Sequence, residues 1–217
     1  MPFYDPYDTS KFDPAFASPA LVAIPPATLL YRVHHRTRAA SELNPTTPTP
    51  FRGGRFDSDD GSYSYLYAST APDGAIAERL VRLLKFGAGP RVLPKVSVDG
   101  LVLSEVEVRT TITVLSLVGA DASHVGQDLW LTTSDPIDYV RTRIWAKAIR
   151  SWVPTAEGFR YLARHDQSHD SCVLFGPPIG GTDGRLSVTS AGVPLDTPDG
   201  YALVRAALQR HNATLSS

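Results

Sequence analysis

Short apolar runs, rich in β-branched and aromatic side chains, recur along the chain and predict β-strands rather than long helices. The runs cover residues 28–34, 63–69, 91–98, 101–109, 111–117, 158–162, 172–175 and 185–189. Asp99 and Gly100 separate two of them, and Asp-Gly is a typical turn sequence of a two-residue hairpin. We therefore expect residues 91–98 and 101–109 to pair as an antiparallel hairpin.

Three further segments repeat apolar residues at helical spacing and predict helices over residues 73–84, 136–152 and 199–212. The clearest of the three is 136–152, because Pro136 suits the first turn of a helix. Its periodicity also predicts which side of the helix packs on the sheet. The stripe expected to face the core consists of Ile137, Val140, Ile144 and Ala148.

The order of these elements predicts one α+β domain over residues 27–217, with mixed, mostly antiparallel sheets and flanking helices. No internal repeat and no second set of apolar runs indicates another unit. Residues 1–26 contain many prolines and several aromatic residues, so we expect an extended N-terminal strap that packs onto the domain. The proline-rich segment 44–51 and the glycine-rich segment 176–184 predict loops.

The charges of the chain nearly cancel, with 21 Lys and Arg against 22 Asp and Glu. A nucleic-acid-binding protein usually shows a basic excess, so this balance argues against a nucleic-acid partner. The apolar runs are far shorter than the roughly 20 residues that cross a bilayer, which argues against a membrane partner. The first residues lack the basic and apolar parts of a signal sequence, which favours the cytoplasm. Delivery into a target cell by a machine that reads no such signal stays open.

Arginine residues stand at unusual places in the sequence. Arg32 lies inside an apolar run, and Arg52 and Arg55 flank two glycines in RGGR. A guanidinium is a planar fork and glycine lets backbone N–H groups approach closely, so this combination suits a phosphate group. The alternative is that Arg32 forms a structural ion pair and that RGGR is a surface turn.

Other residues offer chemistry, each with a plain alternative. Glu78 has small neighbours that leave its carboxylate room beside a ligand, whereas a solvent-facing glutamate on a helix is common. His165 and His169 are four residues apart, which invites a metal site, but their context RHDQSHD favours a polar hairpin loop. We therefore expect no metal. The lone Cys172 follows the pattern of a buried, inert thiol.

Several short motifs follow one another in an order that resembles the RES domain, a family named after an arginine, a glutamate and a serine. In chain order they are YRVH, FRGGRFD, YLYAS, AIAE, DYVRTRIWAKAI, GFRYLARHD and SCVLFG. The resemblance covers about residues 29–175, and the spacing of GGRF, YLYAS and AIAE is its most specific part. Residues 1–26 and the chain beyond Pro178 lie outside it.

The resemblance implies a bacterial toxin that a helix-turn-helix antitoxin, or another immunity protein, holds inactive. It also implies a fold similar to that of ADP-ribosyltransferase toxins and NAD as the substrate. The nicotinamide–ribose bond would be cleaved by phosphorolysis with inorganic phosphate or by hydrolysis. Two alternatives remain: a transferase that moves ADP-ribose to a protein, and a catalytically inactive RES-like binding or immunity module.

The resemblance assigns roles to individual residues. The family arginine falls on Arg32, the arginine of GGR on Arg55, the strand tyrosine on Tyr67 and the glutamate on Glu78. Glu78 and Arg32 are expected to be catalytic, Glu78 by stabilising the positive charge that grows on the ribose. Arg32 and Arg55 are expected to hold the pyrophosphate and Tyr67 to contact the nicotinamide end. Tyr31, beside Arg32, is grouped with the NAD-binding residues.

One position departs from the family pattern. The family serine, in the pattern Y-x-S, falls on Ala163 of Tyr161-Leu162-Ala163. We expect Ala163 near the floor of the cleft and an enzyme that is active but slower, with Ser168 or Ser171 available as a substitute. Ala163 is also the feature that supports the inactive-module alternative.

Overall fold

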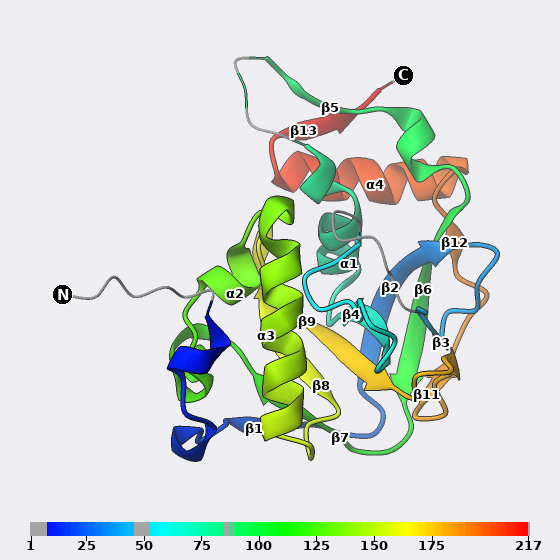
Figure 1. Ribbon diagram of the computed structural model, residues 1–217. Coiled ribbons are helices and arrows are strands. Elements are labelled where there is room, and N and C mark those ends of the chain that lie inside the picture. Colours follow the sequence, from blue (N-terminus) through cyan, green and yellow to red (C-terminus); the bar gives the residue numbers. More distant parts are fainter. Residues whose placement is uncertain (1–7, 46–52, 85–86, 88, 217) are drawn as a thin grey trace.

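A curled nine-stranded sheet forms the body of the protein, in a computed structural model that describes residues 8–45, 53–84, 87 and 89–216 (Figure 1). In spatial order its strands are β1 (Leu21–Ile24), β7 (Ile112–Ser116), β8 (Gly158–Ala163), β9 (Asp166–Gly176), β4 (Ser64–Ser69), β2 (Leu29–His35), β6 (Leu101–Val108) and β11 (Leu186–Val188), and β12 (Val193–Pro194) also pairs with β6. Among the described strands of this sheet, β7 and β8 are the one parallel pair. The predicted single α+β domain with a mostly antiparallel sheet is confirmed.

Helices and two small ladders surround this sheet. The α-helices are α1 (Pro72–Arg79), α2 (Trp130–Thr133), α3 (Tyr139–Trp152) and α4 (Pro198–Arg210). Short 3-10 helices are η1 (Thr9–Lys11), η2 (Pro14–Phe16), η3 (Val81–Leu83), η4 (Lys95–Val98), η5 (Gly119–Val125) and η6 (Pro136–Asp138). The ladders join β3 (Glu42–Leu43) to β10 (Gly181–Thr182) and β5 (Arg91–Leu93) to β13 (Ala213–Leu215).

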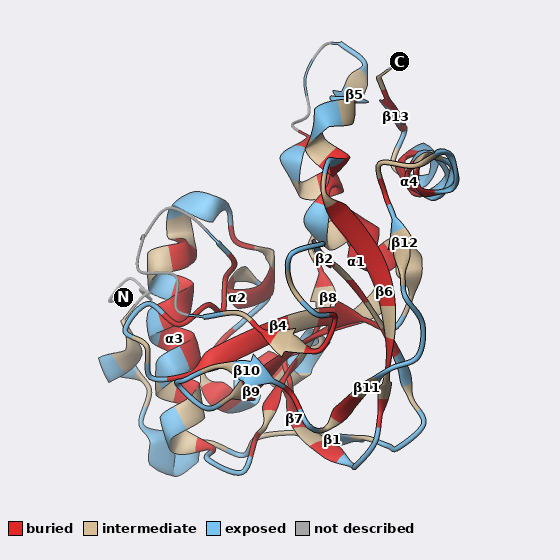
Figure 2. Ribbon diagram, turned by 90° about the vertical axis from the view of Figure 1, so that its right-hand side faces the viewer, coloured by how far each residue is buried: buried red, intermediate tan, exposed pale blue. Residues whose placement is uncertain are grey.

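The helices cover different parts of the sheet and bury separate apolar clusters. Trp145 and Ile149 of α3 pack against aromatic residues of β8 and β9, such as Phe159 and Phe175. Helices α1 and α4 pack together over β6, with η3, β5 and β13 in the same cluster. Figure 2 shows α4 buried on one side and exposed on the other. Because α1 and α4 each bury one side, their apolar residues recur at helical spacing in the sequence, and both helices could be predicted from it.

The face that α3 turns to the core differs from the predicted one. Ile137 is 78% exposed and Ile144 is 47% exposed, so the predicted stripe lies largely toward solvent. The buried residues are Tyr139, Thr142, Arg143, Trp145, Ala146 and Ile149. The large Trp145 ring gains most from burial, and Thr142 and Arg143 find hydrogen-bond partners inside. The buried side of α3 therefore includes polar residues that have hydrogen-bond partners inside, and it differs from the side that apolar spacing predicts.

The predicted hairpin of residues 91–98 and 101–109 is wrong. Pro94 lacks an N–H group and ends β5, and residues Lys95–Val98 form η4 instead of a strand. Strand β5 pairs parallel with β13, near the C-terminus. Gly100 still adopts a left-handed conformation, with φ of 70°, but it leads from η4 into β6.

The N-terminal strap is packed onto the domain and adds a strand to the sheet. Strand β1 pairs antiparallel with β7, and Asp8 and Asp13 cap the two 3-10 helices before it. Phe12 packs against Trp152 of α3, with ring centroids 5.4 Å apart. Residues 1–7 of the strap and residues 46–51 of the predicted loop lie outside the described residues.

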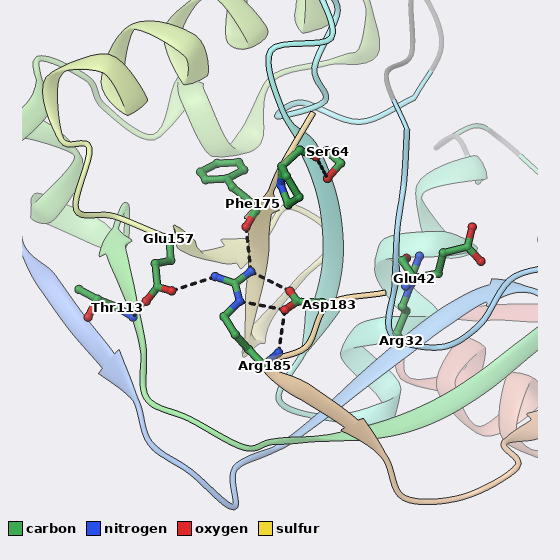
Figure 3. A network of polar contacts seen from close by, with 9 residues as sticks. Arg32, Glu42, Ser64, Thr113, Glu157, Phe175, Asp183 and Arg185 are labelled. Atoms are coloured by element: carbon green, nitrogen blue, oxygen red, sulfur yellow. Dashed lines mark hydrogen bonds and ion pairs between the residues drawn. The ribbon is translucent and has the colours of Figure 1, made fainter. Parts of the chain in front are cut away.

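A polar network joins the turn before β11 to the β7–β8 side of the sheet (Figure 3). Arg185 donates to both carboxylate oxygens of Asp183, at 2.9 and 2.7 Å, and to Glu157 Oε1 at 3.0 Å. It also donates to the carbonyl of Phe175, and Glu157 Oε2 accepts the N–H of Thr113. Asp183 is 4% exposed, and the guanidinium of Arg185 is the cation that pairs with its buried carboxylate.

We predict that Arg185→Met lowers the free energy of unfolding by about 3 kcal/mol, because the buried Asp183 carboxylate loses its cation. Urea unfolding measures the change. The matched control is Arg205→Met on the exposed side of α4, which is expected to change stability by less than about 0.5 kcal/mol. Equal stability of the two variants would show that the network contributes little.

Candidate functional site

The sheet parts between β2 and β4. Among the described residues their register contains the single pair Tyr31↔Ser69. Each strand is fully paired on its other side, β2 with β6 from Leu29 to His35 and β4 with β9 from Ser64 to Ser69. Beyond Tyr31 the two strands therefore diverge and leave a gap inside the sheet.

A cavity of about 330 Å³ lies at this gap. Its volume is at the lower end of the range that small-molecule sites occupy. Its lining residues come from both diverging strands, from the segment after β2, from residues 53–57, from α1 and from single residues of η3, α3 and β8. Among them are Tyr31, Arg32, Arg55, Tyr67 and Glu78. The structure thus brings together all five residues that the sequence singled out as an NAD site.

Arg32 is buried, at 4% exposure, and spans the gap. Its Nη1 donates to the carbonyls of Ala40 and Glu42, at 2.8 and 2.7 Å, and its Nη2 donates to Asn44 Oδ1 at 3.2 Å. Asn44 in turn forms an isolated β-bridge with Tyr65 of β4. Burial lowers the pKa of Arg32 to about 10, so the guanidinium is still charged at neutral pH. Arg32 therefore links β2 to β4 indirectly, by carbonyl and amide contacts rather than by the ion pair considered as its alternative.

The loop of residues 53–57 is held by its own aspartate. The Asp57 carboxylate accepts the N–H of Gly54 at 2.8 Å and the hydroxyl of Tyr67 at 2.9 Å. The same hydroxyl accepts the N–H of Phe56 at 2.9 Å. A Cβ at Gly54 would lie 2.6 Å from the Tyr67 hydroxyl, so only glycine fits. The sequence suggested that glycine N–H groups of RGGR bind phosphate. The Gly54 N–H is instead used within the loop, where it donates to Asp57.

Helix α3 completes this anchoring from the other side. Arg143 Nε donates to the carbonyl of Gly54 at 3.1 Å, and Thr142 Oγ1 donates to the carbonyl of Arg55 at 2.9 Å. Burial raises the pKa of Asp57, while its hydrogen bonds and the charge of Arg143 work in the opposite direction. The N–H groups of Gly54 and Phe56 and the carbonyls of Gly54 and Arg55 therefore all have side-chain partners, and these contacts hold the loop in place as a wall of the cavity.

Arg55 projects from this wall with an unused donor. The residue is 6% exposed, and its Nε has no hydrogen-bond partner in the described part of the chain. Its guanidinium carbon lies 5.5 Å from the ring centroid of Tyr139, and that of Arg82 lies 5.8 Å from the same ring. A buried donor without a partner favours an anionic or carbonyl ligand. Arg52, the other arginine of RGGR, lies outside the described residues.

Glu78 lies in the last turn of α1 and faces the cavity. Its side chain is half-buried rather than directed wholly to solvent, and its Oε2 accepts a hydrogen bond from the Tyr161 hydroxyl at 3.3 Å. The described lining residues include five arginines, namely Arg32, Arg38, Arg55, Arg79 and Arg82, against the carboxylates of Asp57 and Glu78. The cavity is therefore cationic and offers one carboxylate that the loop does not use.

Ala163 does not lie where it was expected. It is fully buried at the end of β8, and the cavity-lining residues do not include it. Tyr161, two residues earlier on the same strand, does line the cavity. A hydroxyl at position 163 would thus act on the cavity only through neighbouring residues.

The remaining candidates do not line the cavity. His165 and His169 belong to the β8–β9 hairpin, and no group of three metal-ligating side chains occurs in the described ranges. Burial and nearby arginines lower the pKa of His165 to about 4. Cys172 is buried, and burial raises the pKa of its thiol to about 12, as expected for an inert cysteine.

Sequence reasoning missed several residues that build the site. Asp57 follows RGGRF directly, so its place in the motif was a usable signal. Arg143 and Tyr139 lie on a helix side that apolar spacing assigned to solvent. Tyr161 was noted only as part of the Y-x-S pattern, and its contact with Glu78 joins residues far apart in the sequence.

We predict that Tyr67→Phe lowers the free energy of unfolding by about 1–3 kcal/mol, because Asp57 loses a donor and the Phe56 N–H loses its acceptor. Thermal or urea unfolding measures the loss. Tyr201→Phe is the control, since Tyr201 packs in the cluster around α4, away from this loop. A Tyr67→Phe variant as stable as Tyr201→Phe would contradict the anchoring role.

A comparison with protein families gives one match to this chain. The model of the family described as RES domain matches residues 29–190, which include every described residue that lines the cavity. The match continues beyond residue 175, where the resemblance by motif ended, and takes in β11. A search of curated proteins gave no match. No helix in the described part of the chain is long and apolar enough to span a membrane. With three quarters of its length matched, the chain belongs to the RES domain family.

Proposed function

We propose that the protein is an NAD-consuming toxin that cleaves the nicotinamide–ribose bond. The main support is that Arg55 and Glu78 line the same cationic cavity, and that the buried Nε of Arg55 has no hydrogen-bond partner among the described residues. RES domains are associated with NAD-utilising enzymes, and the family assignment supports the same substrate. The proposal places the enzyme in the cytoplasm, with a helix-turn-helix antitoxin or another immunity protein as its neutralising partner.

The cavity suits the chemical parts of NAD. A pyrophosphate carries two negative charges, and Arg55 with Arg82 would hold it by charge-assisted hydrogen bonds. The rings of Tyr31 and Tyr67 offer flat surfaces to nicotinamide or adenine. Because the Tyr67 hydroxyl already bonds Asp57 and Phe56, its ring rather than its hydroxyl would contact the ligand. In this proposal Arg32 mainly keeps the cavity open.

The reaction needs stabilisation of a cation more than it needs an acid. When the bond between nicotinamide and ribose breaks, its electron pair leaves with nicotinamide, which departs neutral. The anomeric carbon becomes oxocarbenium-like, and the Glu78 carboxylate would stabilise that charge. An oxygen of water or inorganic phosphate then bonds to the anomeric carbon, and water loses a proton in the hydrolytic case.

Nicotinamide release from NAD by the purified protein tests the proposal. Release that requires added phosphate would indicate phosphorolysis, and release without phosphate would indicate hydrolysis. Release that requires a protein acceptor would indicate the ADP-ribosyltransferase alternative. No release under any of these conditions would contradict the proposed function and favour an inactive module.

We predict that Glu78→Gln lowers kcat by about 100-fold or more, because the variant loses the charge that stabilises the oxocarbenium-like state. The fold should persist, since a glutamine oxygen can still accept the hydrogen bond of Tyr161. Steady-state nicotinamide release measures the effect. Glu107→Gln is the matched control, because Glu107 is half-buried on β6 and does not line the cavity. Near-wild-type turnover of Glu78→Gln would remove Glu78 from the mechanism.

We also predict that Arg55→Lys weakens NAD binding by about 10-fold. A planar guanidinium can donate two parallel hydrogen bonds to one phosphate, and an ammonium group cannot. Calorimetric titration with NAD, made in the Glu78→Gln background so that NAD is not rapidly cleaved, measures the affinity. Arg205→Lys, on the exposed side of α4, is expected to bind NAD like the wild type. Equal affinities of the two variants would exclude Arg55 from the binding site.

A further inference from the structure

Tyr161 is held in place by the core of the protein. It lies on β8, between β7 and β9, opposite Ser171. The residue is 1% exposed, and its ring meets that of Phe56 edge-on, with centroids 5.4 Å apart and planes at 70°. Phe56 packs in the same way against Phe159. The position of the Tyr161 hydroxyl is therefore set by the core.

Glu78, by contrast, has a long side chain near the end of a short helix. Helix α1 contains 8 residues and ends at Arg79, and its chain continues into η3. In the described ranges, the hydrogen bond from Tyr161 to Oε2 is the one polar contact that the Glu78 carboxylate makes. A glutamate has three side-chain torsions, so one directional contact decides where its carboxylate points.

We propose that Tyr161 is a positioning residue, whose hydroxyl donates to Glu78 Oε2 and orients the carboxylate for the bound ribose. This inference rests on the proposed function of the cavity. Glu78 Oε1 is left without a partner among the described residues and so remains available to a ligand. The geometry assigns to Tyr161 no contact with the reacting atoms, and its action goes through Glu78.

The protonation of Tyr161 agrees with this role. Burial, together with the charge of Glu78, raises the pKa of the Tyr161 hydroxyl well above its ordinary value, so the group stays a donor at neutral pH. Tyr67, which also lines the cavity, has its hydroxyl bonded to Asp57 and Phe56. Since Ala163 stands at the family serine position, Tyr161 is also the residue of β8 that carries a hydroxyl.

The test is Tyr161→Phe, made both in the wild type and in Glu78→Gln, with Tyr201→Phe as the control. The phenylalanine ring keeps the packing against Phe56. In the wild-type background we expect kcat for nicotinamide release to fall by about 10-fold, with KM changed by less than about twofold. In the Glu78→Gln background we expect no further loss, because the carboxylate that Tyr161 orients is already gone. Tyr201→Phe should leave kcat unchanged in both backgrounds.

A merely structural role would give a different result. If Tyr161→Phe lowers kcat by the same factor in both backgrounds, or has no effect in the wild type, the positioning role is overturned. If the wild type releases no nicotinamide, the proposed function fails by itself, and crystal structures of the wild type and Tyr161→Phe decide the positioning role. A Glu78 carboxylate that moves in Tyr161→Phe supports it, and one that keeps its place overturns it.

Discussion

The site exists because two neighbouring strands stop pairing after a single residue pair. An unpaired strand edge inside a protein leaves backbone N–H and C=O groups that need other partners. Here β2 and β4 keep complete ladders on their outer sides, with β6 and β9, so their separation does not unravel the sheet. The Arg32 guanidinium binds the carbonyls of Ala40 and Glu42 and the side chain of Asn44, and Asn44 connects to β4 through its bridge with Tyr65. The buried charge of Arg32, in the middle of β2, thus accompanies the opening of a cavity between two strands of one sheet.

The two functional walls of the cavity differ in stiffness. Residues 53–57 are tied by Asp57, by Tyr67 and by two side chains of α3, so the backbone that carries Arg55 is anchored on both sides. The opposite wall carries Glu78 on a short helix with one hydrogen bond to the core. For the proposed reaction, this arrangement would hold the anionic part of the ligand on fixed donors and leave the direction of the carboxylate to its one contact with the core.

The sequence allowed the fold class and most strands to be predicted, because short β-branched runs are a local signal. It did not allow the face of α3 to be predicted, because Arg143 is buried by pairing with the carbonyl of Gly54, which lies far away in the chain. The partner of β5 was missed for the same reason, since β13 follows it by more than a hundred residues. The residues of the cavity were found through short motifs, whereas the contact between Tyr161 and Glu78 needed three-dimensional coordinates.

The C-terminal part of the chain lies beyond the family match yet belongs to the same folding unit. Leu195, Val204, Leu208 and Leu215 are buried in one cluster with Ile76 of α1 and with Leu80, which directly follows that helix. A recombinant fragment trimmed at residue 190 would therefore leave the apolar side of α1 open to water. Such a fragment would retain every family motif and still lose the support of the helix that carries Glu78. For expression trials and chimeras, the boundary of the homologous region is thus the wrong place to cut.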